Sequence, residues 1–406
     1  MVRMYDALET RNADERAAAL AEALPSQVAR AKALSGYGEA LADVDPAAIT
    51  DMSALAALPV LRKSELGAKQ SADEPFGGFT TRRAQDFDHV FQSPGPLYEP
   101  GMISKDWWRM GRFLHAAGIG AGDIVQNCFG YHLTPAGMIF ESGARAVGSA
   151  VLPAGTGQTD LQVRAAVDVG TSAYAGTPDY LKVILDRAAE MGVSLNISKA
   201  AVSGGALFPS LRQEYAERGI SCLQCYATAD LGNIAYESPA MEGMIVDEGV
   251  IVEIVTPGTG NPVAEGEVGE VLVTTLNADY PLIRFATGDM SAWLRGESPC
   301  GRTNVRIKGW MGRADQTAKV KGMFVRPEQV ASLVARHSHV HKARVIVTRE
   351  NEMDKMHVQI EADGGDWTEY ANDVHDLMKL KASIEVLEPG ALPKDGIVVE
   401  DKRSYD

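Results

Sequence analysis

Residues 172–192, SAYAGTPDYLKVILDRAAEMG, place a short strand directly before an amphipathic helix. The strand ends in a glycine turn, after which Thr177 stands where a helix cap belongs. Pro178 suits the first helical turn because its missing N–H would have no partner there, and Gly192 closes the helix. One helix face carries an apolar stripe, formed by Leu181, Ile184, Leu185 and Ala188. A strand followed by such a helix is the repeating unit of α/β folds.

The same alternation continues on both sides of this stretch, from about residue 60 to residue 240. Other short runs that end in Gly, Pro or Ala turns are DIVQNCFGY, AVGSAVLPAG, KAAVSGGA and SCLQCYA. Such alternation predicts a mostly parallel sheet covered by helices. The first sixty or so residues look helical and amphipathic until Pro59 interrupts the pattern.

The predicted pattern of secondary structure changes after residue 244. Residues 249–276, GVIVEIVTPGTGNPVAEGEVGEVLVTTL, alternate strands with tight turns and predict an antiparallel, barrel-like or hairpin insert. From about residue 314 a compact tail fits a small α+β unit. The predicted fold is therefore α/β, with a large N-terminal domain over residues 1–313, β-rich near its end, and a small mobile domain over residues 314–406.

Composition narrows the class of partner. The chain has 406 residues, 45% of them hydrophobic, and a formal net charge of −15, which opposes binding to nucleic acid. We expect a small-molecule partner. The sequence has no apolar run of about 18 residues, and its N-terminus is too acidic for a signal peptide. We therefore expect no membrane segment and a cytoplasmic location.

The one close cysteine pair, Cys222 and Cys225, lies in a predicted strand. Positions three apart in a strand point to opposite faces, and no second pair completes a zinc site. Two small buried side chains are the preferred interpretation, and no metal site is predicted.

Three stretches have the character of loops that build a site. VSGGALFPS places Gly204 and Gly205 after a strand, where a flat ligand can approach the backbone. QCYATADLGN presents Tyr226 and Asp230, an aromatic face beside an acid, although a polar turn with a surface tyrosine is an equal alternative. YPLIRFATGDMSAW is expected to leave Asp289 exposed after a glycine turn, ready to accept hydrogen bonds from a ribose diol.

Taken in order, these stretches resemble the adenylate-forming acyl-CoA ligases, specifically the phenylacetate-CoA ligase branch. The segments that match this branch in order and approximate spacing span most of the chain: FGYHLTPAGMIFESGARAVGSAVLPAGTGQTDLQ, AGTPDYL, GGALFP, YATADLGN, PLIRFATGD and GRADQTAKVKGMFVRPEQV. The resemblance implies an enzyme that joins a small aryl or short-chain acid to CoA through an acyl-adenylate. AMP or ATP and CoA would be its cofactors. Family members are often dimers, so a homodimer is one possible state.

The resemblance also implies roles for particular residues. Gly204, Gly205 and Ala206 would line the adenine, and Tyr226 would stack on it. Asp289 and Arg313 would hold the ribose, and Asp315 would be the hinge of the small domain. Lys321 and Gly322, within KVKGMFV, would face the CoA channel.

The stretch from Gly130 to Gly137 would border the acyl pocket and contains His132. A partly buried, structurally satisfied imidazole is the preferred interpretation of His132. The alternative is a catalytic role in polarising the acyl carbonyl.

Two segments depart from the family. Residues 91–102, FQSPGPLYEPGM, stand where the family has a phosphate loop of Ser, Thr, Gly and Lys. Pro94 and Pro96 have no N–H to donate, no lysine occurs before Lys105, and the loop is about two residues shorter. We predict that binding of the β- and γ-phosphates is impaired.

The C-terminal end, ALPKDGIVVEDKRSYD, also lacks the family's Gly-Lys turn, whose lysine serves the adenylation step. Lys394 or Lys402 would have to substitute, and neither has the matching offset. Asp230, which with His132 and Lys394 makes up the predicted catalytic set, replaces the usual Glu and is shorter by one methylene. Whether Mg²⁺ takes part stays open.

Three functions remain compatible with this pattern. The first is a working acid:CoA ligase with substitutes for the lost groups. The second is an ATP-independent enzyme of the same fold that transfers or hydrolyses acyl-AMP or acyl-CoA. The third is a non-catalytic protein that binds AMP or CoA.

Overall fold

The chain forms two compact units in the computed structural model, which describes residues 4–93, 96–104, 106–256, 260–264, 266–314, 316–350, 353–364, 367–393 and 398–403. One unit comprises Met1–Thr287 and Ala292–Gly309, and the other comprises Gly288–Ser291 and Trp310–Asp406. The predicted division into residues 1–313 and 314–406 stays a prediction, and so does a hinge at Asp315.

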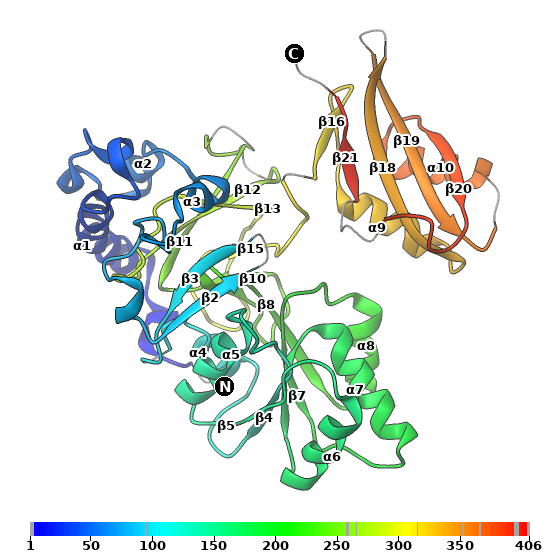
Figure 1. Cartoon of the computed structure of the whole chain (residues 1–406), viewed down its shortest axis with the longest axis horizontal. Coiled ribbons are helices and arrows are strands. Elements are labelled where there is room, and N and C mark those ends of the chain that lie inside the picture. Colours follow the sequence, from blue (N-terminus) through cyan, green and yellow to red (C-terminus); the bar gives the residue numbers. More distant parts are fainter. Residues whose placement is uncertain are drawn as a thin grey trace. The chain divides into compact units, whose positions relative to one another are not determined.

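The first unit is built on a nine-stranded sheet whose parallel half has the order β8-β7-β6-β4-β5 (Figure 1). Its strands are β4 (Ile124–Asn127), β5 (Ala150–Pro153), β6 (Ala173–Gly176), β7 (Lys199–Val202) and β8 (Ser221–Thr228). Each strand lies inside one of the short runs that the sequence marks, except that β8 extends one residue beyond SCLQCYA. The prediction of a mostly parallel sheet between residues 60 and 240 is therefore confirmed.

Helices cover both faces of this parallel half, with α4 and α5 on one side and α6, α7 and α8 on the other (Figure 1). Their bounds are α4 (Gly111–Ala116), α5 (Ala136–Ala146), α6 (Thr159–Val169), α7 (Pro178–Glu190) and α8 (Pro209–Glu217). Cys225 packs in the cluster with α4 and α5, whereas Cys222 packs with α7 and α8. Both are free, buried thiols whose pKa burial raises to about 12. Their placement on opposite faces confirms the expectation.

Helix α7 follows its predicted pattern closely. Leu181 and Ile184 are fully buried and Ala188 nearly so, while Pro178 occupies the first turn. Gly192 has a φ of +69°, which suits a glycine that ends a helix. One detail is wrong. Thr177 is the N-cap residue, but its side chain makes no capping hydrogen bond.

The rest of the first unit is mainly antiparallel. The nine-stranded sheet continues through β9 (Gly232–Tyr236), β10 (Met244–Val246), β15 (Arg306–Ile307) and β14 (Trp293–Leu294). A separate four-stranded sheet has the order β1-β13-β12-β11, from β1 (Leu61–Arg62), β13 (Phe285–Ser291), β12 (Gly269–Thr275) and β11 (Val250–Val255). Strands β11 and β12 pair antiparallel, so the predicted antiparallel insert is confirmed.

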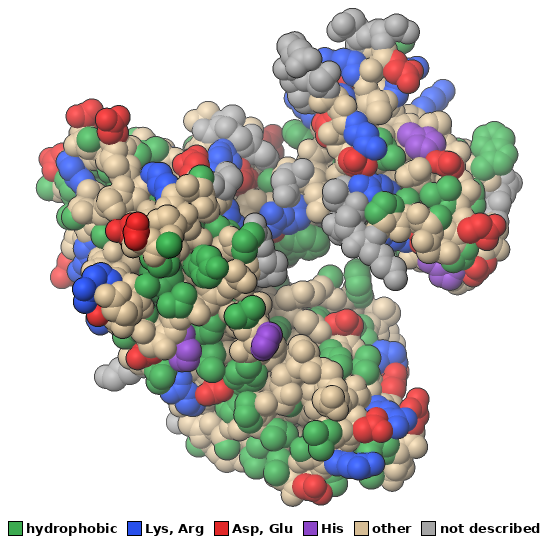
Figure 2. Space-filling view, viewed as in Figure 1, with side chains coloured by type: hydrophobic (Ala, Val, Ile, Leu, Met, Phe, Trp, Pro, Cys, Tyr) green, Lys and Arg blue, Asp and Glu red, His purple; other side chains and the backbone are tan. Residues whose placement is uncertain are grey.

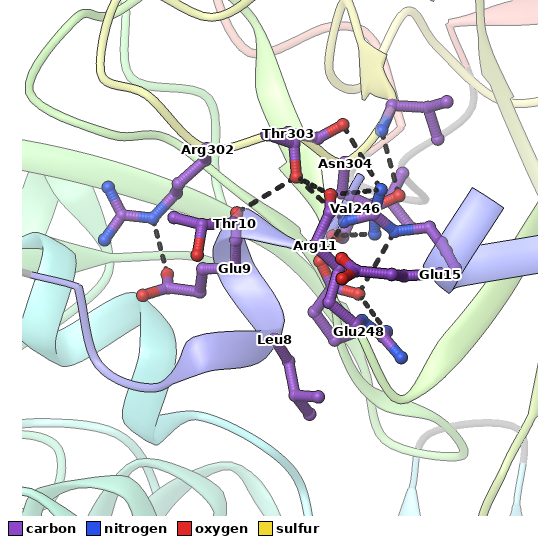
Figure 3. A network of polar contacts seen from close by, with 12 residues as sticks. Leu8, Glu9, Thr10, Arg11, Glu15, Val246, Glu248, Arg302, Thr303 and Asn304 are labelled. Carbon is purple, nitrogen blue, oxygen red and sulfur yellow. Dashed lines mark hydrogen bonds and ion pairs between the residues drawn. The ribbon is translucent and has the colours of Figure 1, made fainter. Parts of the chain in front are cut away.

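The N-terminal segment contains α1 (Ala13–Lys32), α2 (Met52–Ala56) and α3 (Lys63–Lys69), with short 3₁₀ turns at Ala7–Thr10, Gly38–Leu41 and Pro46–Ala48. A polar network fastens its start to the sheet (Figure 3). Arg302 Nε donates to Glu9 Oε1 at 2.5 Å, and both side chains are buried. Arg11 and Arg16 pair with Glu248. A buried ion pair of this kind fixes the geometry because either partner alone would be an uncompensated charge.

Residues 89–101 form a two-stranded hairpin of β2 (His89–Ser93) and β3 (Leu97–Gly101), after a 3₁₀ turn at Ala84–Asp86. Gln70, just after α3, binds this hairpin through both polar atoms of its amide. Gln70 Nε2 donates to Tyr98 O at 2.8 Å, and Tyr98 N donates to Gln70 Oε1 at 2.9 Å. Helix α3 and the hairpin are thereby held together.

The second unit is α+β, as predicted for the tail. A four-stranded sheet has the order β20-β19-β18-β21, and β18 and β19 pair antiparallel. The elements beyond Trp310 are β16 (Ala318–Val320), β17 (Met323–Val325), α9 (Pro327–Arg336), β18 (Val340–Glu350), β19 (Met353–Ala362), α10 (Trp367–Met378), β20 (Ser383–Leu387) and β21 (Val399–Asp401).

Figure 2 shows Lys and Arg side chains scattered among Asp and Glu side chains on the visible face of each unit. Among the helices that the described residues form, none combines the length and the apolar character needed to cross a membrane.

Candidate functional site

The loop after β7 contains the predicted adenine-binding residues Gly204, Gly205 and Ala206, and all three are exposed. Gly204 has a φ of +71°, a backbone conformation that glycine adopts without strain. Ser203, the residue before it, is buried and donates its hydroxyl to Cys225 O at 3.0 Å. This bond ties the loop to β8, so the glycines form an accessible turn on a fixed base.

Tyr226 lies near the end of β8, where a bulge follows it. Its side chain is buried in the main core cluster of the first unit and is 7% exposed. The alternative of a polar turn with a surface tyrosine is therefore wrong. Stacking of this ring on adenine stays a prediction.

Asp230 lies in the tight turn between β8 and β9, and its carboxylate is nearly inaccessible. Lys63 Nζ, at the start of α3, contacts Asp230 Oδ2 at 2.8 Å. Glu99, on β3 of the hairpin, is also buried and accepts a hydrogen bond from Ser93 Oγ at 2.5 Å. Burial first, and then the charge of Asp230, raise the pKa of Glu99 to about 8. Three separate segments thus bring together two buried carboxyl groups and one partly exposed lysine.

Sequence reasoning misses Glu99 and Lys63. Lys63 lies outside the quoted stretches. Glu99 lies within FQSPGPLYEPGM, where sequence reasoning considers only the missing N–H donors and the missing lysine, and their partner Asp230 is remote in sequence. The only available signal is an acid in the middle of a short strand, where burial is costly without a partner.

His132 lies in the turn before α5 and is exposed. The interpretation as a partly buried, satisfied imidazole is wrong, because the turn at residues 132–133 projects from the surface and Leu133 is itself 60% exposed. The backbone of this turn meets the β2–β3 hairpin, since Gln92 N donates to Leu133 O at 2.9 Å. A role of His132 toward an acyl group stays a prediction.

In the second unit, to which residues 288–291 of β13 belong, Asp289 and Arg313 lie together. Arg313 donates to Asp289 Oδ1 at 3.3 Å, and Trp310 Nε1 donates to the same oxygen at 3.0 Å. The expectation that Asp289 is exposed is wrong. It lies within β13 and is 7% exposed, because the chain returns at Trp310–Arg313 and covers it.

Lys321 and Gly322 form the turn of the β16–β17 hairpin and are both exposed. Both have positive φ, +47° for Lys321 and +84° for Gly322. The hairpin therefore presents a lysine at its tip. A place for this tip in a CoA channel stays a prediction.

The remaining predicted residues concern the adenylation step and the hinge. Lys394 and Asp315 lie outside the described residues, as do Lys105 and Pro94. Lys402 is half-exposed and pairs with Glu400 at 3.3 Å. Within the part of the chain that is described, no group of three or more His, Cys, Asp or Glu is placed to hold a metal ion.

Comparison with known proteins gives a consistent set of relatives. No family model matches the chain. A phenylacetate-coenzyme A ligase from Thermus thermophilus is 28% identical over 337 residues, which are 79% of this chain and 75% of the relative. A phenylacetate-coenzyme A ligase from Aromatoleum evansii is 25% identical over 380 residues, 86% of this chain and 84% of the relative.

Solved structures of 2-hydroxyisobutyryl-CoA ligase share the fold. One in the postadenylation state, in complex with R3-HIB-AMP, matches with a TM-score of 0.82 at 23% identity. The match covers 97% of this chain and 91% of the chain in that structure. One in an open conformation, in complex with 2-HIB-AMP and CoA, matches with a TM-score of 0.82 at 21% identity. The match covers 98% of this chain and 93% of the chain in that structure.

Proposed function

Because this chain belongs to the adenylate-forming superfamily, in its phenylacetate-CoA ligase-like branch, we propose that it is an enzyme that forms a CoA thioester from a small aryl or short-chain acid through an acyl-adenylate. We propose further that its activation of the acid by ATP is impaired. AMP, as part of the adenylate, and CoA are the ligands that the proposal requires.

One observation supports the second part of the proposal. The hairpin that we predict to replace the family's phosphate loop carries Glu99, a buried carboxyl beside Asp230, and no lysine. A phosphate loop works by converging N–H donors and a positive charge on anionic oxygens. Pro94 and Pro96 supply no N–H, and Glu99 adds an acid. Such a hairpin disfavours a polyanion such as the β- and γ-phosphates.

A second candidate is an ATP-independent enzyme that transfers or hydrolyses acyl-AMP or acyl-CoA. The contact between Asp289 and Arg313 supports it, because a chain that keeps a ribose-binding pair but has an altered phosphate loop would suit a ligand with one phosphate. A protein that only binds AMP or CoA is the third reading, and the absence of any turnover would favour it.

Thermal unfolding with AMP, ATP or CoA, each with and without Mg²⁺, tests the proposed ligands. A ligand at a hundred times its Kd adds about 2.7 kcal/mol of stability. We expect AMP and CoA to raise Tm and ATP to raise it no more than AMP does. A larger Tm increase with ATP would contradict an impaired phosphate site, and no increase with any ligand would contradict nucleotide and CoA binding together.

A further inference from the structure

The cluster around Glu99 joins three segments of the first unit. Lys63 comes from α3, Ser93 and Glu99 from the β2–β3 hairpin, and Asp230 from the β8–β9 turn. Glu99 is 1% exposed and Asp230 is 4% exposed. Two carboxyl groups are thus withdrawn from water with one lysine beside them.

The hydrogen bonds of this cluster leave one oxygen of each carboxyl group unused. Within the described residues, Glu99 Oε2 and Asp230 Oδ1 are buried without a hydrogen-bond partner, and so is the hydroxyl of Tyr280. An unsatisfied buried acceptor destabilises the folded chain because its hydrogen bonds to water are lost without replacement. A protonated carboxyl is a donor, so a single proton between Glu99 and Asp230 satisfies both orphan oxygens at once.

The charges that face Glu99 lead to the same conclusion. Asp230 and Lys63 are the ionisable neighbours of Glu99, and Ser93 donates a hydrogen bond to it. The Tyr280 phenol faces both acids. Burial raises the pKa of Tyr280, and the charges of Asp230 and Glu99 raise it further. With both carboxyl groups ionised the cluster carries one net negative charge in a buried site. With one proton it is neutral. Two close acids that share one proton are the usual outcome of such an arrangement.

We propose that Glu99 is a positioning residue that shares one proton with Asp230. The hydrogen bond formed by this proton fixes the Asp230 carboxylate beside Lys63 and holds the β2–β3 hairpin against the β8–β9 turn. The proposal rests on the proposed function, because Asp230 is one of its predicted catalytic residues. When pH rises through about 8, the proton leaves to solvent, the two carboxylates repel, and the hairpin is released.

The same proton gives stability a defined pH dependence. The pKa of Glu99 is raised from its usual 4.5 to about 8, so between these values the folded chain keeps a proton that the unfolded chain has lost. Stability then falls as pH rises across this window and levels off above it. A carboxylate held by a salt bridge has the opposite effect, because it makes stability rise with pH.

Two substitutions separate the shared proton from packing. In Glu99→Gln the amide still donates to Asp230 and accepts from Ser93, but it does not titrate. In Glu99→Leu both bonds are lost. Glu65→Gln, an exposed acid on α3, is the matched control. The measurements are kcat and KM for acyl-AMP plus CoA between pH 6 and 9.5, and Tm between pH 5 and 9.

We expect wild-type kcat, relative to that of Glu99→Gln, to fall about tenfold per pH unit above 8, the slope of a single deprotonation, with little change in KM. Both enzymes use the same thiol nucleophile, so their ratio isolates Glu99. Wild-type Tm falls from pH 5 to 8 more steeply than that of Glu99→Gln. Glu99→Leu is slow at every pH, and Glu65→Gln follows the wild type.

Identical kcat profiles for wild type and Glu99→Gln above pH 7, with equal slopes of Tm, would overturn the proposal. The Tm comparison needs no activity. If the wild type has no turnover but its Tm still falls more steeply with pH than that of Glu99→Gln, the proposed function is contradicted and the shared proton is supported. A wild type without turnover and without that difference contradicts both.

Discussion

At the scale of single residues, Asp289 is the acid on which the proposed nucleotide site most depends. Its carboxylate receives N–H groups from Trp310 and Arg313, so its orientation is set before any ligand arrives. Preset acceptors lose little entropy on binding. The pair with Arg313 is partly accessible on the arginine side, which is 40% exposed. A diol that reached this pair would meet a charged acceptor and a charged donor together.

We predict that Asp289→Ala weakens AMP binding by about 1.5–3 kcal/mol, the loss typical of hydrogen bonds to a charged acceptor, or roughly 10- to 150-fold in Kd. Isothermal titration calorimetry measures the change. Asp363→Ala is the control, because Asp363 is an exposed acid of the same unit that pairs with His341. Equal Kd values for wild type and Asp289→Ala would remove Asp289 from the site.

Periodicity in the sequence predicts some residue environments and not others. The burial of Cys222 and Cys225 on opposite faces follows from strand alternation alone. The burial of Asp289 does not, because it depends on Trp310 returning across it from beyond the strand. Glu99 is missed for the same reason, since its partner Asp230 is remote in sequence. Local patterns carry no information about such tertiary pairs.

At the scale of elements, the β16–β17 hairpin is the part of the second unit whose tip is best defined chemically. Its two-residue turn, Lys321–Gly322, has both φ angles positive, the combination that hairpin turns of this length favour. Around the tip, Phe324 lies under the cations of Lys319 and Arg326, at 5.7 and 5.5 Å from the ring centre. A cationic, partly aromatic tip suits the phosphates and the base of CoA.

We predict that Gly322→Ala weakens CoA binding about tenfold, equivalent to about 1.4 kcal/mol, because a left-handed alanine costs roughly 1–2 kcal/mol and the turn relaxes away from its present shape. Gly390→Ala is the control. Gly390 has nearly the same φ, +86°, and open space around its Cα, as Gly322 has. Equal CoA affinities for the two variants would show that the tip does not contact CoA.

Elements with their own strong pattern are predictable, and elements defined by partners are not. Helix α7 is predictable from Pro178 in its first turn, its apolar stripe and Gly192 after its end. The hairpin of β2 and β3 has no such pattern. Its prolines and short length suggest an altered loop, whereas Gln70 and Glu99 fix it in place through contacts with α3 and the β8–β9 turn.

At the scale of the whole molecule, the order of the motifs predicts the architecture well, because strand–helix alternation leaves few alternatives to a parallel sheet covered on both faces. The departures from the family lie in contiguous segments of the sequence, and they stay predictions. The substrate acid is not predictable from the sequence, because a pocket is lined by side chains from several loops whose spacing is set only on folding. Rotation of a small domain about Asp315, and a lysine that replaces the family's, stay predictions.

The central claim is that conversion of an acyl-adenylate, by transfer of the acyl group to CoA or to water, survives while activation by ATP is impaired. Attack of a carboxylate on the α-phosphate builds negative charge between two anions, and each missing preorganised group costs about 10²- to 10³-fold in rate. Attack of the CoA thiol on an acyl-adenylate depends more on positioning. The two routes therefore separate on the same protein.

The most direct test compares the rate from synthetic acyl-AMP plus CoA with the rate from the same acid plus ATP, Mg²⁺ and CoA, over a panel of aromatic and short-chain acids. We predict that the acyl-AMP route is faster by at least about 10²-fold for every acid accepted, with thioester or free acid as the product. Equal rates by the two routes would show that Lys394, Lys402 or another cation restores the activation step, and would contradict the account.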